Sequence, residues 1–168
     1  MRYIVDGYNL FFTYQEVYPS VSFEDARALF IQTICSLASK SRLKITLVFD
    51  THHVQEPDLL PHVKKLSGID VIYAPSDLSC DDYIIEMLSG HKSHLNWTIV
   101  TSDNNLQRMA KQKNTLCLST HSFIELIDKK ICKNSLSLDT KNSNFTHRDQ
   151  KRWEKIFEQK IDGKNVDQ

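Results

Sequence analysis

Five short hydrophobic runs recur along the chain, each rich in β-branched or aromatic residues. Within each run the apolar positions follow one another instead of alternating with polar ones, which is typical of strands covered on both faces. The runs cover residues 3–5, 45–49, 70–74, 97–102 and 115–119. Together they predict the strands of a buried sheet.

Segments with helical periodicity lie between these runs. Residues 23–39 follow Ser22, a residue type favoured as an N-cap, and place Ala26, Phe30 and Ile34 on one apolar stripe. Shorter helical patterns cover residues 81–88, 105–111 and 121–130. The alternation of strands and helices predicts an α/β fold with a mainly parallel central sheet.

A change of composition divides the chain into two parts. Residues 135–145 are rich in Ser, Asn, Asp and Thr, as linkers are, and residues 147–160 form one more helical pattern. The apolar positions of that last helix are Trp153, Ile156 and Phe157. We predict one domain over residues 1–130, followed over residues 131–168 by a polar linker and a C-terminal helix that docks on the domain. An RNA-binding arm is the alternative for this tail.

The overall charge is balanced, because 21 Lys and Arg residues face 21 Asp and Glu residues. This balance gives no support for steering of nucleic acid or membrane by the whole surface, although it leaves room for a local basic patch. The four cysteines are scattered without a C-x-x-C pair, and no apolar stretch reaches the length of a membrane span. We expect a soluble, cytoplasmic protein with no membrane partner.

Aspartates follow the predicted strands. Asp6, Asp50 and Asp103 come directly after three of the runs, and Asp81 and Asp82 open the helix after a fourth. The carboxyl ends of parallel strands share one edge of a sheet, so these carboxylates are expected to converge there. Converging carboxylates repel one another unless a cation lies among them, and Mg²⁺ or Mn²⁺ is the natural choice for oxygen ligands.

Each polar residue at this edge also has a simpler explanation. An aspartate at a strand end is often a turn former or helix cap, and Asp82 in particular suits the first turn of a helix. Gly7 would let the backbone turn sharply after Asp6. Asn9 could be a neutral oxygen ligand or could orient a carboxylate, and Ser102 could hydrogen-bond an acid or a phosphate.

Four motifs give the chain a family resemblance. VDGYN, VFD, SCDDYIIE and VTSDN, in this order, resemble the YacP-like branch of NYN domains in the PIN-like nuclease superfamily. The resemblance covers residues 1–130. It implies an α/β/α nuclease fold of the PIN-like/NYN type that cuts RNA with Mg²⁺ or Mn²⁺ held by an acidic cluster.

The resemblance also assigns roles to particular residues. It implies catalytic roles for Asp6, Asp50, Asp81 and Asp103. It implies metal binding by Asp6, Asp81, Asp82 and Asp103. Asn9 matches the asparagine of the first motif, and Ser102 is expected to support the acids. The chain departs from the branch at Ser79 and Cys80, where Thr and Ala are usual, and at Asn104 and Asn105, which leaves substrate contacts there open.

The leading hypothesis is therefore a metal-dependent endoribonuclease acting on single-stranded RNA. We expect RNA as partner, with messenger RNA, including messenger RNA on the ribosome, as first candidate. Arg108 and Lys111 are expected to bind phosphates and Tyr8 to stack on a base. The alternative is a non-catalytic RNA- or ribosome-binding module. A Rossmann-type nucleotide binder is disfavoured because no G-x-G-x-x-G follows the first strand.

Overall fold

The computed structural model describes residues 1–14, 21–51, 62–90 and 96–136. The chain divides into two compact units, Met1–Ser135 and Leu136–Gln168. The predicted C-terminal helix over residues 147–160, and with it the predicted docking, lies outside the described residues. No helix in the described part of the chain is long and apolar enough to cross a membrane.

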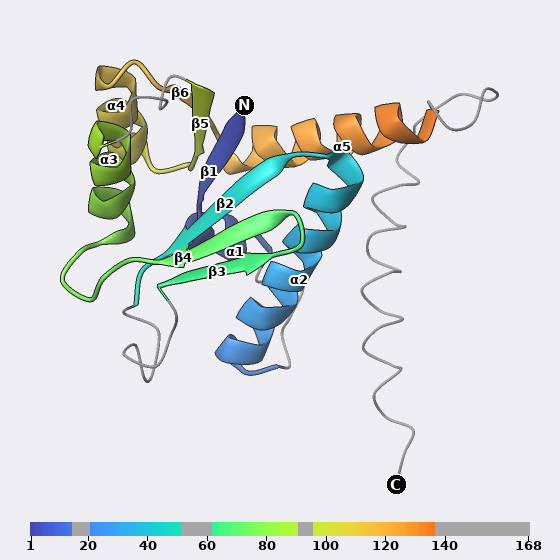
Figure 1. Cartoon of the computed structure of the whole chain (residues 1–168), viewed down its shortest axis with the longest axis horizontal. Coiled ribbons are helices and arrows are strands. Elements are labelled where there is room, and N and C mark those ends of the chain that lie inside the picture. Colours follow the sequence, from blue (N-terminus) through green and yellow to red (C-terminus); the bar gives the residue numbers. More distant parts are fainter. Residues whose placement is uncertain (15–20, 52–61, 91–95, 137–168) are drawn as a thin grey trace, which may run out of the picture. The chain divides into compact units, whose positions relative to one another are not determined.

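A six-stranded sheet in the order β3-β4-β2-β1-β5-β6 forms the centre of the first unit (Figure 1). The strands are β1 Arg2–Asp6, β2 Lys44–Phe49, β3 Val63–Leu66, β4 Ile69–Tyr73, β5 Trp97–Val100 and β6 Leu116–Leu118. All neighbours pair in parallel except β3, which is antiparallel to β4. The predicted mainly parallel sheet is confirmed. The edge strand β3 was not predicted, because its VKKL sequence is largely exposed and lacks an apolar run.

Five helices accompany the sheet in the described part of the chain. They are α1 Gly7–Tyr14, α2 Phe23–Ser41, α3 Cys80–Gly90, α4 Asn104–Gln112 and α5 Thr120–Leu136. The side chain of Ser22 caps α2 by accepting a hydrogen bond from the Asp25 amide, as its sequence indicated. Helix α1 was not predicted, and α5 continues beyond residue 130, where the predicted helix ended.

The helices cover both faces of the sheet. On one face, α3 and α4 bury an apolar cluster against the strands. Its members are Ile4, Val48, Ile72, Cys80, Ile84, Leu88, Trp97, Ile99, Leu106 and Ala110. On the other face, Tyr3 of β1 contacts Phe123 of α5, and Phe49 of β2 contacts Tyr8 of α1, with ring centroids 5.2 and 4.9 Å apart. The predicted three-layer α/β fold is confirmed.

Gly7 joins β1 to α1 without a loop. A Cβ atom at this position would lie 2.5 Å from Cε1 of Phe49, closer than such atoms approach in real structures. The described glycine with a positive φ is instead Gly68, in the turn between β3 and β4. The sharp turn expected at Gly7 is thus a direct strand-to-helix transition, and a side chain is excluded there by the Phe49 ring.

Candidate active site at the carboxyl edge of the sheet

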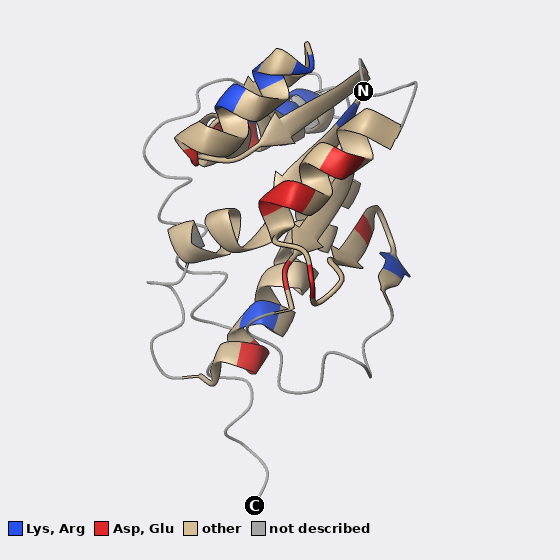
Figure 2. Cartoon of the chain, turned by 90° about the vertical axis from the view of Figure 1, so that its left-hand side faces the viewer, with Lys and Arg blue, Asp and Glu red and all other residues tan. Residues whose placement is uncertain are grey.

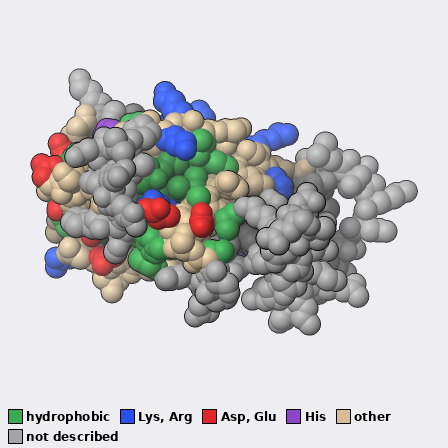
Figure 3. All heavy atoms as spheres, turned by 90° about the horizontal axis from the view of Figure 1, so that it is seen from below, with side chains coloured by type: hydrophobic (Ala, Val, Ile, Leu, Met, Phe, Trp, Pro, Cys, Tyr) green, Lys and Arg blue, Asp and Glu red, His purple; other side chains and the backbone are tan. Residues whose placement is uncertain are grey.

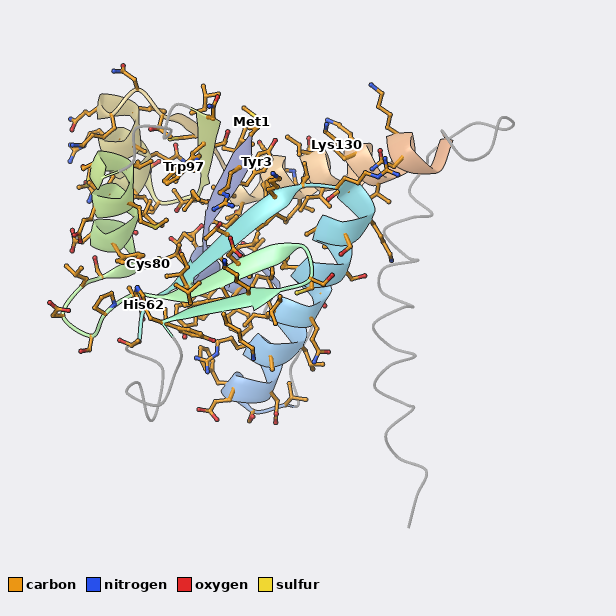
Figure 4. The ribbon with its side chains drawn as sticks, viewed as in Figure 1. Met1, Tyr3, His62, Cys80, Trp97 and Lys130 are labelled. Atoms are coloured by element: carbon orange, nitrogen blue, oxygen red, sulfur yellow. The ribbon has the colours of Figure 1, made fainter. Side chains whose placement is uncertain are left out.

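The sheet brings the predicted aspartates to one edge. Strand β1 lies between β2 and β5, so Asp6 at its end has Asp50, after β2, on one side and Asp103, after β5, on the other. Strand order reverses at β1, and such a switch point is where parallel α/β sheets bind ligands. Figure 4 shows Cys80, at the start of α3, near this end of the sheet, whereas Met1 and Tyr3 lie toward the opposite end of β1.

Asp6 is the most enclosed of these acids, at 8 % exposure. Its Oδ1 accepts a hydrogen bond from the backbone N–H of Asn9 at 3.1 Å, and its Oδ2 accepts one from the Thr101 hydroxyl at 3.3 Å. The buried Cys80 thiol lies 3.9 Å from Oδ1. The Asp6 carboxylate is therefore held in a fixed orientation by elements on both sides of β1.

Asn9 and Ser102 support the site through the backbone. The Asn9 side-chain oxygen accepts the Ser102 N–H at 2.8 Å, which ties the start of α1 to the loop after β5. The Ser102 hydroxyl lies 2.8 Å from the hydroxyl of Thr120, at the start of α5. Ser102 thus contacts α5 rather than one of the acids. Asn9 fixes this loop and donates to Asp6 through its main chain.

Asp103 and Asp82 begin helices. Oδ1 of Asp103 accepts the N–H groups of Asn105 and Leu106 at 2.7 and 2.9 Å, so Asp103 is the N-cap of α4. Oδ2 of Asp82 accepts the Ser79 hydroxyl at 2.7 Å, while the Asp82 N–H donates to Ser79 Oγ at 3.1 Å. The Ser79 side chain thus caps the start of α3, and Asp82 holds that side chain in place. The described contacts of Asp82 are those of a helix start, and its metal binding stays a prediction.

The acids repel one another across the edge. Burial raises the pKa of the Asp6 carboxyl, hydrogen bonds from Asn9 and Thr101 lower it, and the negative charges of Asp50 and Asp103 raise it further. Burial, followed by the charges of four other aspartates, raises the pKa of Asp81 to about 6. Those aspartates are Asp6, Asp103, Asp82 and Asp50. Side chains distant in sequence therefore share one negative field. In Figure 2, red segments mark the starts of α3 and α4, and the blue segments of α4 lie farther along that helix.

The donor set suits a hard divalent cation. Carboxylate oxygens are the preferred ligands of Mg²⁺ and Mn²⁺, and a cation would relieve the repulsion that raises the Asp81 pKa. Among the described residues, no three His, Cys, Asp or Glu side chains form a ready-made metal cage. A site without three clustered ligands still suits Mg²⁺, because Mg²⁺ keeps several waters and commonly takes only one or two carboxylates from a protein.

The metal-free protein is expected to lose stability as the pH rises from about 4 to about 6. Because Asp81 binds its proton more tightly in the folded state, its contribution is fully present below its ordinary pKa of 3.8 and is lost as the pH passes about 6. Thermal melts in chelator across this range measure the effect. The Asp81→Asn variant should give a flatter profile, and identical profiles would contradict the raised pKa of Asp81.

The structure corrects the prediction that Tyr8 stacks on a base. Its side chain is 6 % exposed, and its ring packs against Phe49, Phe23 and Phe12. The Tyr8 hydroxyl accepts a hydrogen bond from Arg27 at 3.0 Å. A base cannot reach this ring, because core aromatics already surround it.

Arg108 and Lys111 lie on α4, on a shallow surface hollow that they share with Asn104, Gln107 and Gln112. Arg108 donates to the side chain of Asn105 at 2.9 Å. Each residue of a helix advances about 1.5 Å, so Lys111 lies more than a turn farther from the acids than Asn104. The binding of phosphates by Arg108 and Lys111 stays a prediction.

Sequence reasoning missed the burial of Arg27 and the contacts of the Cys80 thiol with Val48 and Asp6. Cys80 is buried, its thiol donates to the Val48 carbonyl at 3.3 Å, and burial raises its pKa well above the ordinary value. Arg27 is 8 % exposed on α2. A signal existed for Arg27, since it lies three residues before Phe30 and seven before Ile34, on the apolar stripe of that helix.

The fold and its edge define a class of protein: a parallel α/β domain with an acidic site, as in PIN-like nucleases. The family model of the YacP-like NYN domain matches residues 3–164. The chain belongs to the YacP-like NYN domain family, and this membership supports a ribonuclease-type function. The match extends past residue 130, where the sequence motifs ended.

Solved structures share this fold. The crystal structure of Rae1 (YacP) from Bacillus subtilis matches with a TM-score of 0.60 and 21% identity, over 98% of this chain and 86% of that chain. A crystal structure of a point mutant of Rae1 matches with a TM-score of 0.59 and 21% identity, over 79% of this chain and 77% of that one. No curated protein sequence matches the chain significantly.

Proposed function

We propose that this protein is a divalent-metal-dependent endoribonuclease that hydrolyses phosphodiester bonds in single-stranded RNA. The observation that carries the proposal is the shared negative field at the carboxyl edge, where burial and the charges of aspartates in β1, after β2, after β5 and in α3 raise the pKa of Asp81. Such a field is costly to maintain without a cation. Membership in a PIN-like nuclease family supports the same reading.

Asp6, Asp50, Asp81 and Asp103 would carry the reaction. Mg²⁺ or Mn²⁺, when bound, would neutralise charge on the phosphodiester and activate a water molecule. Asp6, Asp81 and Asp103 are the proposed ligands. Asp6 is held rigid by Asn9 and Thr101. The hydrogen bonds between Asp82 and Ser79 favour a role for Asp82 in charge and at the helix start, and make it the weakest of the ligand candidates.

The proposed partner is RNA, with messenger RNA, including messenger RNA on a ribosome, as the first candidate. The family supports an RNA substrate. We propose the cytoplasm as compartment. The absence of a disulfide among the four cysteines, all in the described part of the chain, supports a reducing environment.

Chelation tests the proposal. Purified protein should cut a single-stranded RNA in Mg²⁺ or Mn²⁺, lose cleavage in excess EDTA, and regain it when the metal is restored. The reason is that the carboxylates alone repel the phosphodiester. Full cleavage in excess chelator would rule the mechanism out. RNA that is bound but never cut, in either metal, would favour the non-catalytic RNA-binding module.

A further inference from the structure

A buried arginine lies beside the acidic edge without an acidic partner at contact distance. Arg27 donates from Nη1 to the Tyr8 hydroxyl at 3.0 Å, and its Cζ lies 5.9 Å from the centre of the Tyr73 ring. In the described part of the chain no carboxylate forms an ion pair with Arg27. A phenol and an aromatic ring are thus the described partners of this charge.

Among the described residues, Tyr8 is the one acceptor that forms a hydrogen bond with the Arg27 guanidinium. An arginine has five N–H donors, and a buried charge normally needs a partner that satisfies several of them. The buried side-chain oxygens or nitrogens that lack a partner in the described structure are Oγ1 of Thr46 and of Thr98. No nitrogen of Arg27 is among these described atoms, so we take the donors that Tyr8 does not bind to be available to a ligand, although the side chain as a whole is buried.

The rings around Arg27 connect it to the acids. Phe49, the last residue of β2, has its ring centroid 4.9 Å from that of Tyr8 and 5.8 Å from that of Tyr73. Asp50 follows Phe49, and its negative charge is felt at the Tyr8 hydroxyl, where it contributes to the raised pKa of Tyr8. Arg27 therefore lies on the Asp50 side of the acidic edge.

An aromatic side chain nearby is exposed. Phe12 stacks on Tyr8 with ring centroids 5.9 Å apart, yet it is 46 % exposed. Phe12 and Arg27 thus contact the same residue, Phe12 at the Tyr8 ring and Arg27 at the Tyr8 hydroxyl. Proteins hold the phosphate and base of single-stranded nucleic acid by pairing a cation with an aromatic ring. Figure 3 shows one face of the molecule, on which acidic side chains adjoin hydrophobic ones.

We infer that Arg27 forms a phosphate-binding subsite for one nucleotide of a single-stranded RNA, with Phe12 as the stacking surface for its base and Tyr8 as the residue that positions the guanidinium. The planar guanidinium matches phosphate oxygens in a two-point contact. The subsite lies on the α1 and α2 side of the acids, whereas Arg108 and Lys111 lie on α4. The inference rests on the proposed function for the identity of the ligand as RNA.

Binding of a labelled single-stranded RNA, measured by fluorescence anisotropy in EDTA over a series of salt concentrations, tests the subsite. Arg27→Gln should weaken binding by about tenfold, as for the loss of one charge-assisted contact. It should also reduce the slope of log affinity against log salt by about 0.7, because one phosphate contact is lost. Arg27→Lys should keep the slope, because it keeps the charge, and bind more weakly than the parent. Phe12→Leu should weaken binding with the slope unchanged.

Arg42→Gln is the matched control. Arg42 is the exposed C-cap of α2, the helix that also carries Arg27. The substitution Arg42→Gln therefore removes the same charge at the opposite end of α2. Equal losses in Arg27→Gln and Arg42→Gln, or parent affinity and slope in a folded Arg27→Gln, would overturn the subsite. If Arg27→Gln does not fold, Tyr8→Phe replaces it. This variant should weaken binding at the parent slope, and parent affinity would overturn the subsite.

The outcome is separable from that of the proposed function. Binding is measured without metal, so a parent protein that binds through Arg27 but never cuts RNA in Mg²⁺ or Mn²⁺ would refute the nuclease and leave the subsite standing. If the parent cuts RNA by its acids while Arg27→Gln binds RNA with parent affinity, the subsite is refuted and the nuclease stands. A parent without measurable RNA affinity in EDTA would overturn the subsite.

Discussion

Replacing Asp6 by Asn is expected to lower single-turnover RNA cleavage by about 100-fold or more, because one charge of the proposed cation site is lost. The fold should survive. The Asn side-chain oxygen can still accept the Asn9 N–H, and its amide can donate to the Thr101 hydroxyl, so both contacts that hold Asp6 have replacements. Metal affinity should fall together with cleavage.

The same change should leave thermal stability equal or higher at neutral pH. Asp6 is the first charge among those that raise the Asp81 pKa, so its removal should return that pKa toward its ordinary value. A melt beside the cleavage assay, with NMR titration of Asp81, measures both effects. RNA affinity in EDTA should be unchanged or slightly higher, since a charge that repels phosphate is gone.

Two further substitutions act as references. Asp103→Asn should also abolish cleavage without unfolding the protein, because Asn caps helices as well as Asp does. Asp82→Asn should cost a few tenths of a kcal/mol in stability and retain most activity, as expected for a residue whose described contacts are those of a helix start. A folded Asp6→Asn variant that cuts RNA at the parent rate would contradict the acidic-cluster mechanism.

Gly7→Ala is expected to lower the free energy of unfolding by about 1 to 3 kcal/mol, the usual cost of forcing a methyl group into a packed core. Three ring carbons of Phe49 lie within 2.8 Å of the added Cβ, and Phe49 is fully buried between Tyr8 and Tyr73. The ring can therefore move only by disturbing its neighbours. The melting temperature should fall by about 3 to 10 °C, as expected for a chain of this length.

A second glycine and a double mutant separate this clash from a general effect of alanine. Gly90→Ala should be neutral or slightly stabilising, because a Cβ at Gly90 meets nothing within 4 Å. Phe49→Leu removes part of the ring, so Gly7→Ala should cost less in that background than in the parent. Equal costs in the two backgrounds would show that the Phe49 ring is not what excludes a side chain at Gly7.

The sequence was informative wherever one local pattern determined the outcome. Apolar runs identified the parallel strands, and a parallel sheet must bring Asp6 and Asp103 to one edge, so their proximity followed from topology. Strand β3 was not predicted, because its formation depends on pairing with β4 and not on a pattern in its own sequence. Helix α1 was not predicted, because Asp-Gly is a frequent turn signal. The Phe49 ring, which leaves no room for a side chain at Gly7, explains why a glycine stands there.

The roles of individual side chains were harder to predict. Tyr8 has an aromatic side chain of the kind that stacks on bases, and only the packing of α1 against β2 shows that it is buried. Arg27 was not noticed because its significance depends on Tyr8 and Tyr73, which are distant in sequence. Asp82 had two readings from its position alone, and the Ser79 contact favours the helix start. Burial and partners of this kind come from tertiary structure.

Ser102 has a consequence for how the site opens. Successive amides connect the start of α5 to the first acid: Thr120 donates to Ser102 Oγ, Ser102 donates to Asn9 Oδ1, and Asn9 donates to Asp6 Oδ1. The loop after β5 therefore cannot lift away on its own, because its departure breaks contacts to α1 and α5 together. We therefore expect movement of this loop to be shared with α1 and α5, and a substitution in the first turn of α5 to disturb the orientation of Asp6.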